Sequence, residues 1–370
     1  MKFKILQDDF SKYLNTALRF TNSKMQLPVL GNILLKTEKG RLYIKATNLE
    51  TSVVITAGAK VESEGEITMP ARVIAEIVAN LNAGQIDVEV DKEKMAISNA
   101  NFKSVISGMN TSDFPKIADK ISTNSIQMSS QELSQTLRNV LPAVSRDETR
   151  PILTGVLVVL DKNGATFVGT DGFRLSKKTV KLQNNEETRR FVLPKNTIAE
   201  IVRLSSDSEN VDFALKESDN QVVFAFPNLV LASRIIDGEF PDFERIIPKQ
   251  SEITVKCDKE EMLRAVKLAS IFARESANVI KISFPGDGLH IQAESSKSGS
   301  ENFNLEAKIE GAISKGFTIA FNYRFVEEFL TITSSDEVVF KLNDANSPSV
   351  FLDPQDAGFL HIIMPIRLQS

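Results

Sequence analysis

The chain has 370 residues and a mass of 41.0 kDa, which is more than one ordinary hydrophobic core and predicts two or three domains. With 44 Lys plus Arg against 48 Asp plus Glu, the net charge of -4 excludes a uniformly basic protein but allows a local basic stripe. The single cysteine, Cys257, excludes an internal disulfide framework and a cysteine-based zinc site. The first residues lack the apolar core of a signal peptide, and no stretch approaches a membrane span. We therefore expect a cytoplasmic protein without membrane contact.

The sequence offers little for enzymatic chemistry. It contains neither a phosphate-binding loop of the G-x-x-x-x-G-K-[ST] type nor a dinucleotide-binding G-x-G-x-x-G turn. The only two histidines are His290, in the alternating run GLHIQAE, and His361, in the apolar run FLHIIM. Both patterns indicate histidines packed on strands rather than catalytic bases. We predict a protein that is not an enzyme and binds no metal or cofactor, with a hydrolase that uses the Asp171 region as the first alternative.

The elements taken in chain order repeat. One set of segments joins a strand to an amphipathic helix that begins at a capping residue: residues 3–20, 125–144 and 252–272. A second set joins a short β-rich run to a helix with apolar residues at i, i+3 and i+4: residues 67–81, 191–206 and 317–333. Arg72, Lys195 and Tyr323 hold similar places in the second set. Three copies of one pattern therefore fill the chain.

The helix starts carry local signals of their own. Asp8-Asp9 and Glu260-Glu261 suit first helical turns, where carboxylates favour the free N–H groups. Ser129 with Glu132, and Asp258 with Glu261, have the form of capping boxes.

About three alternating strands follow each helix, so each third of the chain should read β-α-β-β-β twice. We predict an α+β fold of three repeated domains, separated by proline-punctuated charged segments. The expected domains are residues 1–122, 123–250 and 251–370.

Six similar units tend to curve, and two such chains joined head to tail would close a ring that leaves no free sheet edges. Helices would then line one surface, and basic residues recur on them. A basic lining in an acidic protein suits phosphate contact that is independent of sequence, and the absence of Trp with only three Tyr favours duplex over single strands. A duplicated scaffold with ordinary solvated helix faces is the alternative. The basic residues are Lys12, Arg19, Lys24, Arg72, Arg138, Arg146, Arg150, Lys195, Arg203, Arg264, Lys267, Arg274 and Arg324.

Seven short motifs in a fixed order give the chain a resemblance to a known family. They are LPVLGNILL (27–35), MPAR (69–72), DFP (113–115), TRPILTGV (149–156), TDGFRL (170–175), FPDFERIIP (240–248) and MPIRL (364–368). Over its whole length the sequence resembles the bacterial sliding clamps, the beta subunits of DNA polymerase III. The resemblance implies a DNA-clamp fold, closed as a head-to-tail homodimeric ring with helices inside and sheets outside. It also implies a processivity factor without catalytic activity.

The resemblance also implies partners and sites. The partners are double-stranded DNA bound without sequence preference, the polymerase III alpha subunit, the clamp loader, and other polymerases and repair proteins with a short clamp-binding motif. A peptide pocket between the second and third domains would involve Arg150, Ile152, Leu153, Thr170, Gly172, Phe173, Arg174, Leu175, Pro241, Ile246, Asn322, Phe325, Ile362, Met364, Pro365, Ile366 and Arg367. DNA would contact Lys24, Arg72 and Arg150, together with Lys12, Arg138, Arg203, Arg264 and Lys267. The two chains would meet through Lys103, Ile106, Ile271, Phe272 and Glu301.

A few positions depart from the family pattern. Phe325 stands where a tyrosine is common, Gly169 where an alanine is common and Ile366 where a methionine is common, and Gln369-Ser370 extend the usual terminus. Pro365 cannot donate to a sheet, so we expect the last strand to stop there and to expose the residues that follow. A peptide-binding scaffold without a role on DNA is the second alternative function.

Overall fold

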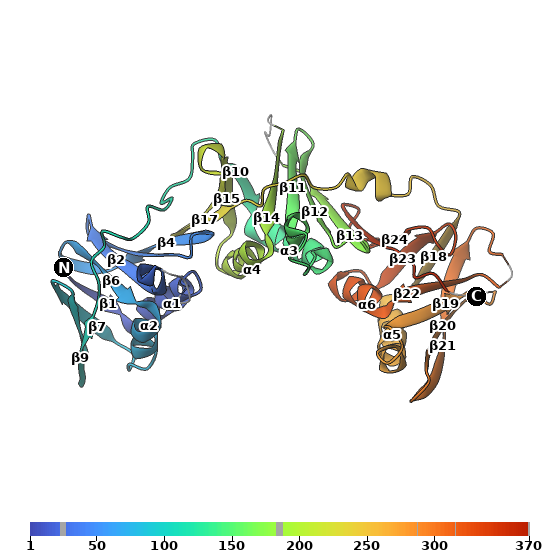
Figure 1. Ribbon diagram of the computed structural model, residues 1–370, viewed down its shortest axis with the longest axis horizontal. Helices are drawn as coiled ribbons and strands as arrows, with labels where there is room; N and C mark the ends of the chain where they lie inside the picture. Colours follow the sequence, from blue (N-terminus) through green and yellow to red (C-terminus); the bar gives the residue numbers. More distant parts are fainter. Residues whose placement is uncertain (23–26, 183–187, 287, 315, 369–370) are drawn as a thin grey trace. The chain divides into compact units, whose positions relative to one another are not determined.

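The computed structural model describes residues 1–22, 27–182, 188–286, 288–314 and 316–368 (Figure 1). In this part of the chain, the predicted order of one strand, one helix and three strands occurs six times. The first third contains β1 (Lys2–Leu6), α1 (Gln7–Leu18), β2 (Asn32–Glu38), β3 (Arg41–Thr47) and β4 (Thr51–Gly58), then β6 (Gly65–Pro70), α2 (Ala71–Ala79), β7 (Gln85–Asp91), β8 (Lys94–Asn99) and β9 (Phe102–Ser107). An additional strand, β5 (Lys60–Ser63), lies between these two halves and was not predicted.

In their described residues, the second and third thirds follow the same order without an extra strand. The second contains β10 (Ile126–Ser129), α3 (Ser130–Val140), β11 (Gly155–Asp161), β12 (Gly164–Thr170) and β13 (Arg174–Val180), then β14 (Arg189–Pro194), α4 (Lys195–Leu204), β15 (Asn210–Lys216), β16 (Gln221–Phe226) and β17 (Leu229–Arg234). The last contains β18 (Ile253–Asp258), α5 (Lys259–Ala273), β19 (Val279–Ser283), β20 (Gly288–Ser295) and β21 (Gly299–Glu310), then β22 (Thr318–Asn322), α6 (Tyr323–Ile332), β23 (Glu337–Leu342), β24 (Ser349–Leu352) and β25 (Phe359–Ile363). The repeated α+β architecture expected from the sequence is confirmed.

Most of the predicted helix starts are present. Asp8 and Asp9 lie in the first turn of α1, as predicted. Asp258 caps α5, since its carboxylate accepts a hydrogen bond of 2.8 Å from the backbone N–H of Glu261. Ser129, the other predicted cap, is the last residue of β10, and α3 begins one residue later.

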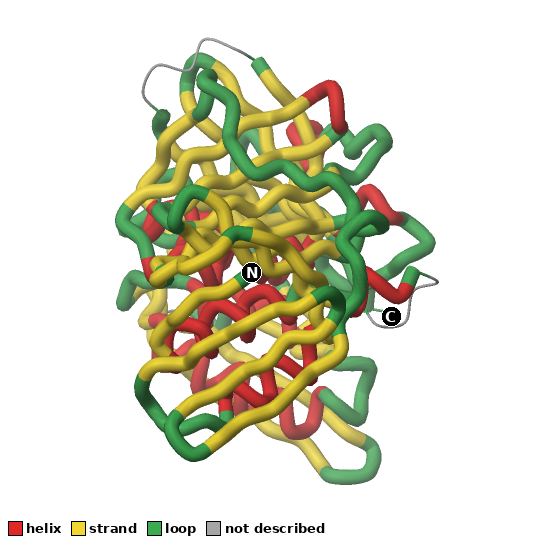
Figure 2. The backbone as a smooth tube through the Cα atoms, turned by 90° about the vertical axis from the view of Figure 1, so that its left-hand side faces the viewer, coloured by secondary structure: helices red, strands yellow, loops and turns green. Residues whose placement is uncertain are grey.

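The chain forms two compact units, Met1–Gln131 with Arg203–Ile235 and Glu132–Val202 with Ile236–Ser370. The first unit holds an eight-stranded sheet in the order β10-β15-β16-β17-β4-β3-β2-β6 and a five-stranded sheet in the order β5-β1-β7-β8-β9. Helices α1 and α2 pack against each other, and α1 also contacts β3 and β4. Figure 2 shows this end of the chain, with strands lying across the helices. Helix α1 thus covers one face of β3, which explains the alternating burial along that strand.

The second unit contains a single twelve-stranded sheet in the order β14-β11-β12-β13-β25-β24-β23-β18-β21-β20-β19-β22. The long strand β21 pairs with β20 over Gly299–Glu306 and with β18 over Ala307–Glu310. A cluster of phenylalanines fills the core beside α6, where Phe329 packs against Phe351 and Phe359. Cys257 is buried, and burial raises the pKa of its thiol to about 12, so it stays protonated and unreactive.

Each unit joins different thirds of the chain through one antiparallel strand pair. In the first unit β17 pairs with β4, and in the second β13 pairs with β25. Each of these four is the last strand of its β-α-β-β-β pattern. Two other final strands differ: β9 is the edge of its sheet, and in the described part of the chain β21 has only β20 as a partner along Gly299–Glu306. No helix among the described residues is long and apolar enough to cross a membrane.

Candidate functional site

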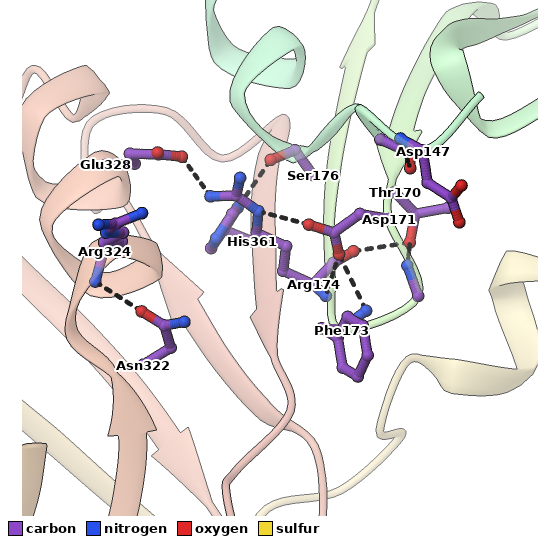
Figure 3. A network of polar contacts seen from close by, with 12 residues as sticks. Asp147, Thr170, Asp171, Phe173, Arg174, Ser176, Asn322, Arg324, Glu328 and His361 are labelled. Atoms are coloured by element: carbon purple, nitrogen blue, oxygen red, sulfur yellow. Dashed lines mark hydrogen bonds and ion pairs between the residues drawn. The ribbon is translucent and has the colours of Figure 1, made fainter. Parts of the chain in front are cut away.

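A tight turn between β12 and β13 forms the centre of the candidate site (Figure 3). The hydroxyl of Thr170 donates to the carbonyl of Arg174 at 2.6 Å and accepts from the N–H of Gly172 at 3.1 Å. One carboxylate oxygen of Asp171 accepts from the N–H groups of Phe173 (2.9 Å) and Arg174 (3.0 Å). Gly172 has a φ of +93°, a conformation that side chains with a Cβ rarely adopt. The turn is therefore fixed by its own side chains.

A cavity of about 540 Å³ opens beside this turn. Leu175 of β13 and Ile362 of β25, which lie directly opposite each other in the sheet, line it together with Met364. Residues of the segment 245–248 form another part of the wall, which includes Ile246 at the end of a short 3₁₀ helix (Phe243–Ile246). An apolar cavity with a few polar groups at its margin suits the capture of a short apolar segment.

Seven of the residues predicted for the pocket line this cavity: Thr170, Gly172, Arg174, Leu175, Ile246, Ile362 and Met364. Six lining residues were not predicted as site residues: Arg245, Ile247, Pro248, Asn343, Ser347 and Pro348. The first three belong to the motif FPDFERIIP, so that motif was the available signal. The other three lie in the connection between β23 and β24, which no motif marked.

Other predicted pocket residues lie outside the cavity lining. Leu153 is 6% exposed and belongs to the apolar core beneath the site. Ile152 packs over Gly238, and Pro241 is exposed on the connection that follows. Arg150 is exposed and donates to the carbonyl of Asp171 at 3.2 Å, so it touches the turn from outside.

The remaining predicted residues border the turn or the end of β25. Phe173 is 63% exposed at the tip of the turn. Asn322 caps α6 by accepting from the N–H of Arg324 at 3.1 Å. The ring of Phe325 lies beneath the guanidinium of Arg174, 4.2 Å from its carbon.

The end of the described chain is attached rather than free. Strand β25 ends at Ile363, two residues before Pro365, close to the predicted stop. The N–H of Met364 donates to the carbonyl of Phe173, and that of Ile366 donates to the carbonyl of Ala320, both at 2.8 Å. Arg367 and Leu368 are exposed as predicted, but Ile366 is half-buried, because its attachment to Ala320 holds it against the neighbouring strand. Gln369-Ser370 lie outside the described residues.

Behind the turn, a polar network joins β13 to β25 and α6 (Figure 3). The guanidinium of Arg174 donates to Asp171 at 3.1 Å and also forms an ion pair with Glu328. Both carboxylate oxygens of Asp171 are thus engaged, one by the backbone of the turn and the other by Arg174.

His361 lies fully buried in the same network. Its Nδ1 shares a hydrogen bond of 2.7 Å with the hydroxyl of Ser176, and its ring stacks on Phe329. Burial, together with the nearby cation of Arg174, lowers the pKa of His361 to about 3, so the ring is neutral at ordinary pH. His361 is thus the packed strand histidine that the sequence predicted.

The same turn occurs a second time, between β3 and β4. The hydroxyl of Thr47 donates to the carbonyl of Thr51 at 3.0 Å and accepts from the N–H of Leu49 at 3.0 Å, and Leu49 has a φ of +72°. The side-chain oxygen of Asn48 accepts from the N–H groups of Glu50 and Thr51, the second and third residues after it, and Asp171 accepts from the second and third residues after it in the same way. In this copy Ser52 and Ala232 stand where the cavity has Leu175 and Ile362. The second turn therefore lacks the apolar floor.

The predicted DNA-contacting residues that lie on described helices are all exposed: Lys12 on α1, Arg72 on α2, Arg138 on α3, Arg203 on α4, and Arg264 and Lys267 on α5. Lys24 lies outside the described residues. A second cavity of about 670 Å³ brings Arg138 together with Arg146, Lys195, Glu327 and Glu328. Burial, and then the cations of Arg146 and Arg174, lowers the pKa of Lys195. Basic side chains from different helices therefore converge at one place.

The residues predicted to join two chains differ in how exposed they are. Lys103 on β9 and Ile271 on α5 are exposed, and Phe272 is half-buried. Ile106, in contrast, is only 7% exposed, because alternation along the strand turns its side chain to the buried face of the sheet. Val105, on the opposite face, is the most exposed apolar residue of β9, at 59%. Glu301 on β21 has a buried carboxylate oxygen without a hydrogen-bond partner, and burial raises its pKa. In the described part of the chain, no cluster of His, Cys, Asp or Glu could hold a metal ion.

Comparison with known proteins extends these observations to the whole chain. Models of the N-terminal, central and C-terminal domains of the DNA polymerase III beta subunit match residues 1–118, 127–242 and 244–367. The beta sliding clamp of Synechocystis sp. strain PCC 6803 is 28% identical over 392 residues, with 100% of both chains covered. That of Staphylococcus aureus strain Mu50 is 27% identical over 378 residues, with 99% of both covered.

Solved structures agree with these relatives. The DNA polymerase sliding clamp of Bacillus subtilis is 26% identical, covers 100% of both chains and has a TM-score of 0.94. The DNA polymerase III beta subunit of Thermotoga maritima is 25% identical, with the same coverage and a TM-score of 0.91.

The buried His361 generates a prediction about stability and pH. Its pKa is about 3 in the folded chain against 6.5 for an ordinary histidine, so the unfolded chain binds the extra proton between these values. Stability should therefore fall as the pH decreases through this window, by about 2 kcal/mol from pH 7 to pH 5 from this residue alone. In a His361→Asn variant the same acidification should have a smaller effect on the denaturant midpoint, followed by circular dichroism. If the denaturant midpoint fell equally with decreasing pH in both proteins, His361 would not be the source of this pH dependence.

Proposed function

Because the chain belongs to the DNA polymerase III beta subunit family, the bacterial sliding clamps, we propose that it is a processivity factor that encircles duplex DNA and tethers polymerases. Matches to all three domain models, in order along the chain, support this assignment. We place the three domains at residues 1–122, 123–250 and 251–370.

The proposed ring is supported by the way in which the last strands of the six β-α-β-β-β patterns pair. The last strand of the first pattern, β4, pairs with the last strand of the fourth, β17, and the third, β13, pairs with the sixth, β25. By this rule the second, β9, should pair with the fifth, β21. Among the described residues of its own chain, β9 pairs only with β8 and β21 pairs only with β20 along Gly299–Glu306, so each has one free edge. A second copy supplies both partners, because β9 of one chain meets β21 of the other in an antiparallel pair, twice in a homodimer.

The helices provide the surface for DNA in this proposal. Basic residues recur on α2, α3, α4 and α5, although the chain as a whole carries a net charge of -4. Phosphate contacts of this kind do not read sequence and weaken with salt, so they permit sliding. The topological link, rather than affinity, would then provide long residence on DNA.

The cavity beside the Thr170 turn is the proposed docking site for partner peptides. Its floor of Leu175, Ile362 and Met364 offers anchor positions for apolar side chains of an extended segment. The partners we propose are the polymerase III alpha subunit, the clamp loader, and other polymerases and repair proteins with a short clamp-binding motif. We assign the chain no catalytic step and no cofactor, and we place it in the cytoplasm.

A proline in β9 should open the proposed ring. The N–H of Gly108 donates to Glu93 on the β8 side at 2.7 Å, so alternation turns the N–H groups of Lys103 and Val105 toward the free edge. Val105→Pro removes one of these donors without breaking the pairing with β8, because proline is tolerated on a free strand edge. In sedimentation, this variant should be a folded monomer of 41.0 kDa, whereas wild type and Val105→Thr should have twice that mass. A dimeric Val105→Pro protein would remove β9 from the interface.

Encirclement should make retention on DNA depend on DNA ends. Protein loaded on a nicked circle should remain bound in high salt and leave within minutes after the circle is cut once, because only the closed path prevents its escape. The Val105→Pro variant serves as the control and should be lost from circles and linear DNA alike. Equal retention of wild type on cut and uncut circles would contradict encirclement.

A single charge in the cavity should abolish peptide binding. Ile246 lines the cavity yet is 39% exposed, so Ile246→Asp should leave the fold intact. The loss of an apolar anchor and the burial of a carboxylate should weaken a labelled alpha-subunit peptide by about a hundredfold. Leu368→Asp is the matched control, since Leu368 is 45% exposed but lies outside the cavity lining. If fluorescence anisotropy gives Ile246→Asp the wild-type affinity, peptides bind elsewhere.

A further inference from the structure

Glu328 on α6 lies behind the peptide pocket and does not line it. Its carboxylate accepts a hydrogen bond from a terminal nitrogen of Arg174, a residue 154 positions earlier in the chain and on the other side of the β13–β25 junction (Figure 3). Arg174 does line the pocket. Glu328 is thus one contact removed from the surface that a partner peptide would touch.

The guanidinium of Arg174 depends on its partners because its side chain is only 9% exposed. A buried charge needs a paired and hydrogen-bonded environment. Asp171 supplies one carboxylate oxygen to Nε at 3.1 Å, but its other oxygen accepts from two backbone N–H groups of the turn. Asp171 therefore holds one edge of the guanidinium and cannot also hold the far end.

The far end is held by Glu328, and the flat face by the ring of Phe325 at 4.2 Å. Contacts on two edges and one face define both the position and the plane of the group. Without Glu328, rotation about the outer side-chain bonds of Arg174 would be opposed only by Asp171 and by the ring of Phe325. The guanidinium can slide over that ring. The wall of the cavity next to Leu175 would then lose its fixed shape.

We propose that Glu328 is a positioning residue for partner binding, which acts through Arg174 to pre-organise the wall of the peptide pocket. This rests on the proposed function of the cavity. A wall that is already ordered in the free protein spares the partner the loss of side-chain freedom on binding. The C-terminal domain thereby adjusts a part of the pocket that the central domain supplies.

The chain offers a matched control at the adjacent position. Glu327 lies on the same helix, is half-buried and faces the same basic cavity with Lys195, but it makes no contact with Arg174. Removal of either carboxylate changes the net charge and the helix equally. Only removal of Glu328 should affect the pocket.

The test is the affinity of a labelled peptide with the clamp-binding motif of the polymerase alpha subunit, measured by anisotropy. Glu328→Ala should weaken binding about tenfold, the value of one charge-assisted hydrogen bond. Glu328→Gln, which keeps an acceptor, should recover most of the loss, and Glu327→Ala should stay within about twofold of wild type. In an Arg174→Met background, Glu328→Ala should add no further loss, because its effect passes through Arg174.

Several outcomes would overturn the proposal. Equal affinities for Glu328→Ala and Glu327→Ala would do so, as would an undiminished effect of Glu328→Ala in the Arg174→Met background. A general loss of structure would appear as a lower thermal midpoint that Glu328→Gln does not restore, and this too would count against positioning. If wild type fails to bind the peptide, the function proposed for the cavity is wrong, whereas tight binding by wild type and Glu328→Ala alike refutes only the role of Glu328.

Discussion

The antiparallel pairing of β13 with β25 is the interaction on which the candidate site depends. Its register sets Leu175 opposite Ile362 and Ser176 opposite His361. It also brings the N–H of Met364 to the carbonyl of Phe173. A slip of one residue would turn the side chains of one strand to the opposite face and remove the floor of the cavity. The buried bond between Ser176 and His361, at 2.7 Å, opposes such a slip because another register would leave both groups unsatisfied.

The repeat explains both the scaffold and the uniqueness of the site. The turn at Thr170 and the turn at Thr47 share four kinds of hydrogen bond and a left-handed residue at the same position, Gly172 in one and Leu49 in the other, so the two backbones are similar. They differ in the side chains of the paired strands. Ser52 and Ala232 offer no apolar anchors where Leu175 and Ile362 do. The same framework therefore carries an apolar pair at the junction beside the cavity and a small, partly polar pair at the other.

The charge around individual side chains in this protein differs from what its net charge suggests. Arg174 is buried and neutralised by Asp171 and Glu328, while His361 beside it stays neutral because burial and that same cation both disfavour its protonation. Lys195 and Arg146 line the same cavity, and burial, followed by the cations of Arg146 and Arg174, lowers the pKa of Lys195. A net charge of -4 therefore coexists with a local gathering of Arg138, Arg146 and Lys195 around one cavity.

The helices and strands could be predicted from the sequence, because helix periodicity, capping residues and strand alternation act over a few neighbouring residues. It predicted the sixfold pattern and the packing of His361, and motif order identified most of the cavity floor. It did not separate Val105 from Ile106 as the exposed residue of β9, and it missed the β23–β24 connection at Asn343. Pairing partners decided these features, as they did the contact of Arg174 with Glu328 across 154 positions. Such contacts depend on which strands meet and in which register, and only the folded chain brings those strands together.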